Sequence, residues 1–217
     1  MPDPLHILHL DDWLAVIDKP SGLLSVAGRG PEKADCVVAR AKTLWPEASE
    51  VHRLDQDTSG IIVIARDPET QRRLHALFAE RTVDKRYIAL TAGHLAADHG
   101  EIDLPLMKDW PNRPLQKVDH EHGKPSQTRW RVLERSTITA NGQELSITRV
   151  ELKPLTGRSH QLRLHLKEIG HPILGDTFYA PPVIVAAAPR LLLHAAMIRF
   201  LHPWTNEQVT FHCACPF

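Results

Sequence analysis

Apolar and polar positions along the chain predict more strands than helices. Apolar residues alternate with polar ones, or form short β-branched clusters, in eight runs that are typical of strands. The first two runs flank Asp11 and Asp12, which predicts a hairpin, and the last is expected to be an edge strand. The predicted strands are 5–10, 13–18, 61–65, 87–91, 126–133, 145–152, 191–200 and 209–212.

Helical spacing of apolar residues predicts helices over 36–44, 68–81 and 159–169. Pro68 suits the first turn of the second helix, and Gly170 suits the end of the third. Because strands outnumber helices without alternating regularly with them, we expect an α+β fold with a mixed, mainly antiparallel sheet. No repeat, low-complexity tract or long linker divides the chain, which predicts a single domain over residues 1–217.

Composition and charge exclude some classes of protein. The chain has 217 residues, of which 42% are hydrophobic and 24% charged, which excludes a disordered, collagen-like or coiled-coil protein. Basic and acidic side chains both number 26, so any surface for a nucleic acid must be a local patch. Segments 107–133 and 149–167 are net positive, and the first contains Trp110 and Trp130. Such segments suit phosphates and unstacked bases, and ordinary solvated surface explains them equally well.

The remaining composition predicts a soluble, cytoplasmic protein. The N-terminus lacks the basic and apolar segments of a secretory signal. The longest wholly apolar stretch, 183–188, is far shorter than the roughly 20 residues that span a bilayer. Cys36, Cys213 and Cys215 are too few for a disulfide framework and indicate a reducing compartment.

A dense group of polar residues lies in segment 51–60, which brings an arginine and two carboxylates to a loop just before a predicted buried strand. A rigid strand can hold such a loop in place, and an aspartate there can act as a nucleophile or a base. The neighbouring Arg53 would stabilise the ionised form of that carboxylate. The alternative is that Asp55 or Asp57 only forms an Asx-turn, which is the commoner role of a loop aspartate.

A second polar group, 156–163, opens the third predicted helix with several hydrogen-bond donors near its positive end. An anion would be stabilised there, although an ordinary capped helix explains the same residues equally well. The histidines and cysteines do not have the spacing of a metal site, and no Gly-rich nucleotide-binding loop follows a strand. We therefore expect neither a metal nor a nucleotide cofactor.

Four motifs together resemble the RluA family of RNA pseudouridine synthases. Segment 52–60, with the sequence HRLDQDTSG, is similar to the family's catalytic loop, and 85–89 to its tyrosine motif. Segment 156–163 is similar to its arginine motif, and 190–195 to its late leucine-bearing strand. The motifs occur in the family's order, and the resemblance extends over about residues 13–212. Segment 109–114, with the sequence DWPNRP, is most similar to the short members of the family.

The resemblance implies an isomerisation of uridine to pseudouridine in RNA that needs no cofactor. The bond between N1 of uracil and C1′ of ribose breaks, the base rotates, and C5 bonds to C1′. By the same resemblance, Asp55 is the essential carboxylate, Tyr87 stacks on the target base, and Arg158 pairs with the carboxylate. Attack at C1′, addition to the ring and elimination all remain open as the chemical role of Asp55.

The resemblance also implies contacts with RNA. A uridine in folded RNA must leave the stack before reaction, and Arg53 is the candidate to fill the gap, although it can also simply brace the loop. The further RNA contacts that we expect are His52, Thr58, Arg113, Lys117, Arg163 and Leu192.

The expected substrates are stem-loops, namely 23S rRNA and the anticodon arm of tRNA. We expect no N-terminal S4-like domain before the predicted hairpin, and we therefore expect the catalytic domain to select the RNA, as a monomer without a membrane partner. A non-catalytic RNA-binding or chaperone module of the same fold is the main alternative. A glycosidase would pair Asp55 with Asp57, and two carboxylates so close in a loop would normally diverge.

Overall fold

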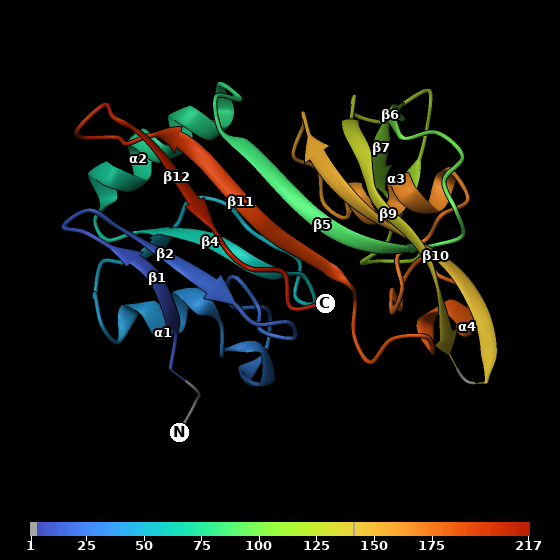
Figure 1. Cartoon of the computed structure of the whole chain (residues 1–217). Helices are drawn as coiled ribbons and strands as arrows, with labels where there is room; N and C mark the ends of the chain where they lie inside the picture. The colour runs from blue at the N-terminus through green and yellow to red at the C-terminus, as the bar shows by residue number, and fades with distance from the viewer. Residues whose placement is uncertain (1–3, 141) are drawn as a thin grey trace. The chain divides into compact units, whose positions relative to one another are not determined.

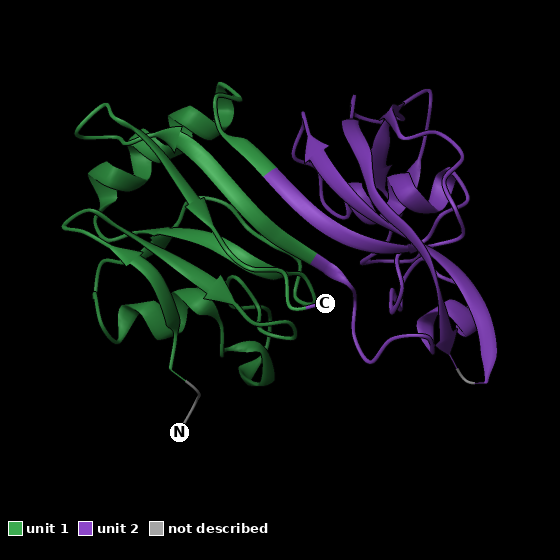
Figure 2. Cartoon of the chain, viewed as in Figure 1, with its two compact units in different colours: residues 1–85, 194–216 green, residues 86–193, 217 purple. Residues whose placement is uncertain are grey.

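The computed structural model describes residues 4–140 and 142–217 and divides them into two compact units (Figure 2). Unit 1 comprises Met1–Lys85 and His194–Pro216, and unit 2 comprises Arg86–Leu193 and Phe217. Each unit is described by itself.

Unit 1 contains a mixed sheet. In it, β1 pairs with β2, β2 with β4, β4 with β3, and β11 with β12, all antiparallel, whereas β4 and β11 run parallel (Figure 1). The mixed sheet and the few helices confirm the predicted α+β class. The elements are β1 (His6–Leu10), β2 (Leu14–Lys19), the short 3-10 helix η1 (Pro31–Lys33), α1 (Val37–Lys42), β3 (Ser49–Glu50), β4 (Ser59–Ala65), α2 (Pro68–Ala79), β11 (Leu193–Leu201) and β12 (Gln208–His212).

Strand β4 is the centre of unit 1, and all seven of its residues are buried. Its apolar residues pack with those of β2, β11 and α2 in one hydrophobic cluster. Gly60 has φ 102°, and a Cβ atom there would overlap the carbonyl of Ala195 on β11. Glycine is therefore required where β4 and β11 begin side by side, directly after the loop that carries Asp55.

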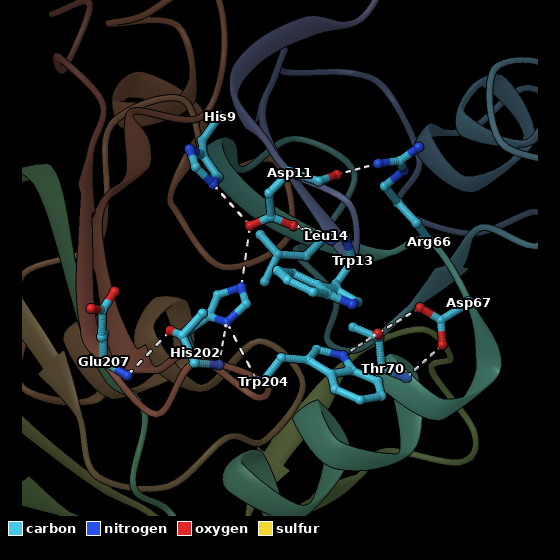
Figure 3. A network of polar contacts seen from close by, with 11 residues as sticks. His9, Asp11, Trp13, Leu14, Arg66, Asp67, Thr70, His202, Trp204 and Glu207 are labelled. Atoms are coloured by element: carbon cyan, nitrogen blue, oxygen red, sulfur yellow. Dashed lines mark hydrogen bonds and ion pairs between the residues drawn. The ribbon is translucent and has the colours of Figure 1, made fainter.

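A polar network joins the turns of two hairpins in unit 1 (Figure 3). One Asp11 oxygen accepts hydrogen bonds from the backbone N–H of Trp13 and Leu14, and the other lies 3.0 Å from His9 Nε2 and 3.2 Å from His202 Nε2. His202 is buried, and its Nδ1 faces the backbone N–H groups of the β11–β12 turn. Asp11 thus links that turn to the β1–β2 turn.

We expect an Asp11→Asn substitution to lower the free energy of unfolding by about 1–3 kcal/mol, because an amide N–H would face the histidine donors. Burial opposes ionisation of Asp11, but its hydrogen bonds to Leu14, Trp13, His9 and His202 outweigh burial and lower its pKa. The contribution of the Asp11 carboxylate to the free energy of unfolding is therefore fully present above the ordinary aspartate pKa, and it is lost as pH falls below about 4. Urea denaturation at pH 7 and pH 3 measures both effects.

The exposed neighbour Asp12 provides the matched control. Asp12→Asn should leave the free energy of unfolding within about 0.5 kcal/mol of the wild-type value. Equal stability of the Asp11 and Asp12 variants at pH 7 would show that the network does not stabilise unit 1.

Unit 2 contains an antiparallel sheet in the order β5-β10-β9-β6 and a separate two-stranded hairpin, β7–β8 (Figure 1). Helix α3 packs against the sheet through buried leucines that join residues of β5 and β10 in a hydrophobic cluster. The elements are β5 (Asp84–Ala92), β6 (His99–Asp103), β7 (Leu106–Lys108), β8 (Gln116–Val118), β9 (Gln127–Ala140), β10 (Gln143–Pro154), α3 (Gln161–Glu168) and α4 (Pro182–Val185).

The structure contains every strand and helix that the sequence predicts, with adjusted limits. Strands β9 and β10 are much longer than predicted because their distal residues alternate between half-buried and exposed positions and lack a continuous apolar run. Strands β3, β6, β7 and β8, the 3-10 helix η1 and helix α4 were not predicted. Within the described ranges, no helix is long and apolar enough to span a membrane.

Candidate active site

The loop 51–58 of unit 1 carries Asp55 and is anchored near its start by His52. His52 Nε2 accepts a hydrogen bond of 3.0 Å from the backbone N–H of Val63 on β4, so this nitrogen is unprotonated. The imidazole stacks on Phe78 of α2 with ring centroids 4.8 Å apart. Burial, together with the charge of Lys85, lowers the pKa of His52 to about 3. His52 is therefore neutral and holds the start of the loop against the sheet.

The Nε2 atom and one ring face of His52 are engaged within unit 1, and the residue is half-buried, so the RNA contact that we expected of it stays a prediction. Thr58 does not fit such a contact, since it is only 2% exposed. Arg53 does fit, because its side chain lies on the exposed surface of the loop.

Hydrogen bonds from segment 19–25 fix the second half of the loop. Ser25 Oγ bonds both the N–H and the carbonyl of Leu54, at 3.0 and 2.7 Å. Ser21 Oγ donates to the carbonyl of Asp57, and the N–H of Thr58 donates to the carbonyl of Asp55. The backbone on both sides of Asp55 is therefore fixed, and its side chain is half-buried.

Lys19 is the residue of this loop support that the sequence analysis missed. Its side chain is fully buried, and Nζ donates to the carbonyls of Pro20, Leu23 and Gln56 at 2.9, 2.7 and 2.7 Å. The available signal was a lysine at the end of a largely apolar run, which the sequence analysis assigned no role.

Unit 2 carries Tyr87 and Arg158. Tyr87 lies on β5 opposite Leu152 of β10 and is half-buried against the core of the unit. The buried Gln161 shapes the loop before α3, because its Oε1 accepts from Thr156 Oγ1 and from the N–H of Arg158, at 2.8 and 3.0 Å. Arg158 Nε is buried and makes no hydrogen bond within the described part of the chain. This nitrogen is available to an anionic group.

Arg163 has a structural role that excludes the RNA contact we expected. Its guanidinium is 2% exposed and forms two hydrogen bonds, of 2.9 and 2.6 Å, with the buried carboxylate of Asp176. Removal of either partner would leave a buried charge uncompensated. Leu192 is half-buried and packs at the edge of two hydrophobic clusters, so only part of its side chain can contact a base.

Cationic and aromatic side chains gather on the segment that joins β7 to β8. Trp110 is 59% exposed, with Lys108 Nζ 4.7 Å and Arg113 Cζ 5.4 Å from its ring centroid. Lys117 is also exposed and lies 3.1 Å from Asp119. Exposed arginine, lysine and indole groups suit phosphates and unstacked bases. Arg113 and Lys117 therefore lie where an RNA contact is possible.

Among the described residues, no group of three or more His, Cys, Asp or Glu side chains is arranged to hold a metal ion. Cys36, Cys213 and Cys215 are all free thiols. Burial, followed by the nearby Asp18, raises the pKa of Cys213 to about 12, which keeps this thiol protonated and unreactive.

Comparisons with known proteins agree with the motifs. The family model described as RNA pseudouridylate synthase matches residues 13–168. The chain is 49% identical to the dual-specificity RNA pseudouridine synthase RluA of Escherichia coli strain K12, over 98% of this chain and 94% of that protein. It is 50% identical to RluA of Pasteurella multocida, over 96% and 93% of the two chains.

A solved structure supports the same assignment. The human RNA pseudouridylate synthase domain containing 1 protein superposes with a TM-score of 0.79 and 29% identity, covering 98% of this chain and 84% of that one. The chain belongs to the RNA pseudouridylate synthase family, and within that family to the RluA-type RNA pseudouridine synthases.

Proposed function

We propose that this enzyme isomerises uridines in stem-loop RNA, with 23S rRNA and tRNA anticodon arms as substrates, and that it acts as a cytoplasmic monomer. The observation that carries the proposal is the loop 51–58, which supports the Asp55 backbone on both sides and leaves the exposed Arg53 beside it. The relatives named dual-specificity RNA pseudouridine synthase support the choice of two RNA classes.

Asp55 is the carboxylate that acts on the target nucleotide. In the reaction the N1–C1′ bond breaks and a C5–C1′ bond forms, the hydrogen on C5 leaves as a proton, and N1 gains a proton. The nucleotide loses one proton at C5 and gains one at N1, so the reaction consumes no co-substrate. Arg158, with its buried Nε lacking a hydrogen bond in the described residues, stabilises an anionic group, and Tyr87 stacks on the base.

Arg113 and Lys117 bind the RNA from the β7–β8 hairpin, together with the exposed Trp110. Their positive charges contact phosphates and predict binding that weakens as salt rises. The exposed part of the Leu192 side chain makes an apolar contact with a base.

Release of tritium from RNA labelled at C5 of uridine tests this function, because formation of the C5–C1′ bond expels that hydrogen. The substrates are transcripts of a tRNA anticodon stem-loop and of a 23S rRNA stem-loop, each incubated with the full chain. We expect release from particular uridines of both transcripts. Binding of both RNAs without any release would instead establish the non-catalytic RNA-binding module.

Arg53→Ala should lower the rate of isomerisation in a stem-loop by about tenfold or more, and should have little effect on an unstructured oligomer. Only the folded RNA must have its uridine unstacked, which costs a few kcal/mol, and the exposed guanidinium can occupy the gap that is left. Single-turnover rates on the two RNAs measure the difference.

The exposed Arg29 supplies the control, since Arg29→Ala removes the same charge from unit 1 outside the loop. Both RNAs should react at wild-type rates with that variant. An equal loss on the two RNAs for Arg53→Ala would refute the role of Arg53 in unstacking and favour simple bracing of the loop.

A further inference from the structure

Tyr179 lies between two segments of unit 2 that the proposed function uses. Its hydroxyl accepts a hydrogen bond of 2.9 Å from the backbone N–H of Gln116, the first residue of β8. The same hydroxyl lies 2.7 Å from Nδ1 of His160, two residues after Arg158. One oxygen atom therefore contacts both the hairpin that carries Arg113 and the loop that carries Arg158.

A buried ion pair fixes the position of Tyr179 itself. Asp176, held by Arg163, accepts hydrogen bonds from the backbone N–H groups of Phe178 and Tyr179 at 2.9 and 3.2 Å. The guanidinium of Arg163 lies 4.7 Å from the ring centroid of Phe178 and 5.4 Å from that of Tyr179. Arg163, a buried residue of α3, thus holds the turn 176–179 in place.

His160 has a backbone conformation that needs such support. Its φ of 55° and ψ of 14° lie in the left-handed region, which is unfavourable for a residue with a Cβ atom. Its ring packs against those of Phe178 and Tyr179, with centroids 5.5 and 5.6 Å apart. These contacts, with the hydroxyl of Tyr179, hold His160 in the conformation that sets the direction of the backbone next to Arg158.

We propose that Tyr179 is a positioning residue of the isomerisation reaction, which sets the place of the Arg158 loop and of the RNA-binding β7–β8 hairpin together. The inference rests on the proposed function. It assigns Tyr179 no contact with the reacting atoms, because its hydroxyl is engaged with Gln116 and His160. Misplacement of a reacting group by about 1 Å is enough to lower a rate by up to about a hundredfold.

Tyr179→Phe removes the hydroxyl and keeps the ring over Arg163. We expect the single-turnover rate on the anticodon stem-loop transcript to fall by about tenfold, and the Kd for that RNA to rise by about threefold. Amide hydrogen exchange at Gln116 should become faster, because its N–H loses its acceptor. The exchange measurement reports the position of the hairpin independently of catalysis.

His160→Ala provides a second variant that breaks the same contact from the other side, and the double variant completes a cycle. If Tyr179 acts through His160, the double variant should lose no more rate than the slower single variant. His94→Ala is the control, because His94 is an exposed histidine of unit 2 whose Nε2 lies 3.0 Å from the backbone carbonyl of Ser136. It should keep the wild-type rate.

A wild-type rate for Tyr179→Phe, or losses that add in the double variant, would overturn the positioning role. Absence of turnover by the wild-type chain on both transcripts would instead reject the proposed function, and the positioning role with it. The wild-type measurement thus separates the two failures.

Discussion

An Asp55→Asn variant is expected to lose at least about a thousandfold in isomerisation rate while its Kd for the stem-loop transcript stays nearly unchanged. The substitution keeps the size of the side chain and the hydrogen bond from the Thr58 N–H to the Asp55 carbonyl, and it removes only the negative charge. The phosphate contacts that we propose for Arg113 and Lys117 lie on another segment. Single-turnover tritium release and filter binding measure the two quantities on the same RNA.

Asp57 is the matched control, since it is also half-buried and lies two residues away in the same loop. Its backbone carbonyl, and not its side chain, accepts the hydrogen bond from Ser21 Oγ. Asp57→Asn should therefore keep most of the rate. If Asp55→Asn converted uridine as fast as the wild type, the carboxylate would not be the group that acts on the nucleotide.

A Lys19→Met variant should be less stable by about 2 kcal/mol or more and should react at least about tenfold more slowly. Methionine keeps the length and the apolar stem but removes a donor from three backbone carbonyls. The carbonyls of Pro20 and Leu23 lose this donor, at about 1–3 kcal/mol for each buried acceptor without a partner, whereas the carbonyl of Gln56 keeps the N–H of Gly22. The carbonyl of Gln56 belongs to the loop that carries Asp55, so the loop should shift as well.

Urea denaturation and single-turnover rates measure these two effects. Lys42→Met tests whether the loss of any lysine is harmful, since Lys42 is exposed at the end of α1. That variant should match the wild type in both measurements. The support that Lys19 gives to the loop would be disproved by a Lys19→Met variant with wild-type stability and rate.

The sequence predicted well those features that depend on neighbouring residues. The β-branched run 61–65 became the buried strand β4, and the proline at position 68 begins α2 as expected. The motif around Asp55 also lies in a loop directly before that strand, as the spacing indicated. Periodicity and turn residues determine these features locally.

Features that depend on distant partners were not predicted. Arg163 and Arg158 are both arginines of one motif, yet only Arg163 is fully buried, because its partner Asp176 lies buried thirteen residues later. His52 is held by the N–H of Val63, and Lys19 by the carbonyl of Gln56 on the loop that follows β3. The three-residue strands β7 and β8 are too short to show a period. Such contacts arise only after the chain has folded.

Pseudouridine mapping of cellular RNA tests the proposal that the enzyme forms pseudouridine at particular uridines. Total RNA from cells with and without the gene is treated with a carbodiimide that marks pseudouridine and is then read by primer extension. We predict that the signal disappears at a few uridines in stem-loops of 23S rRNA and tRNA when the gene is absent, and returns with the wild-type chain but not with Asp55→Asn. An unchanged pattern at every uridine would contradict the proposal.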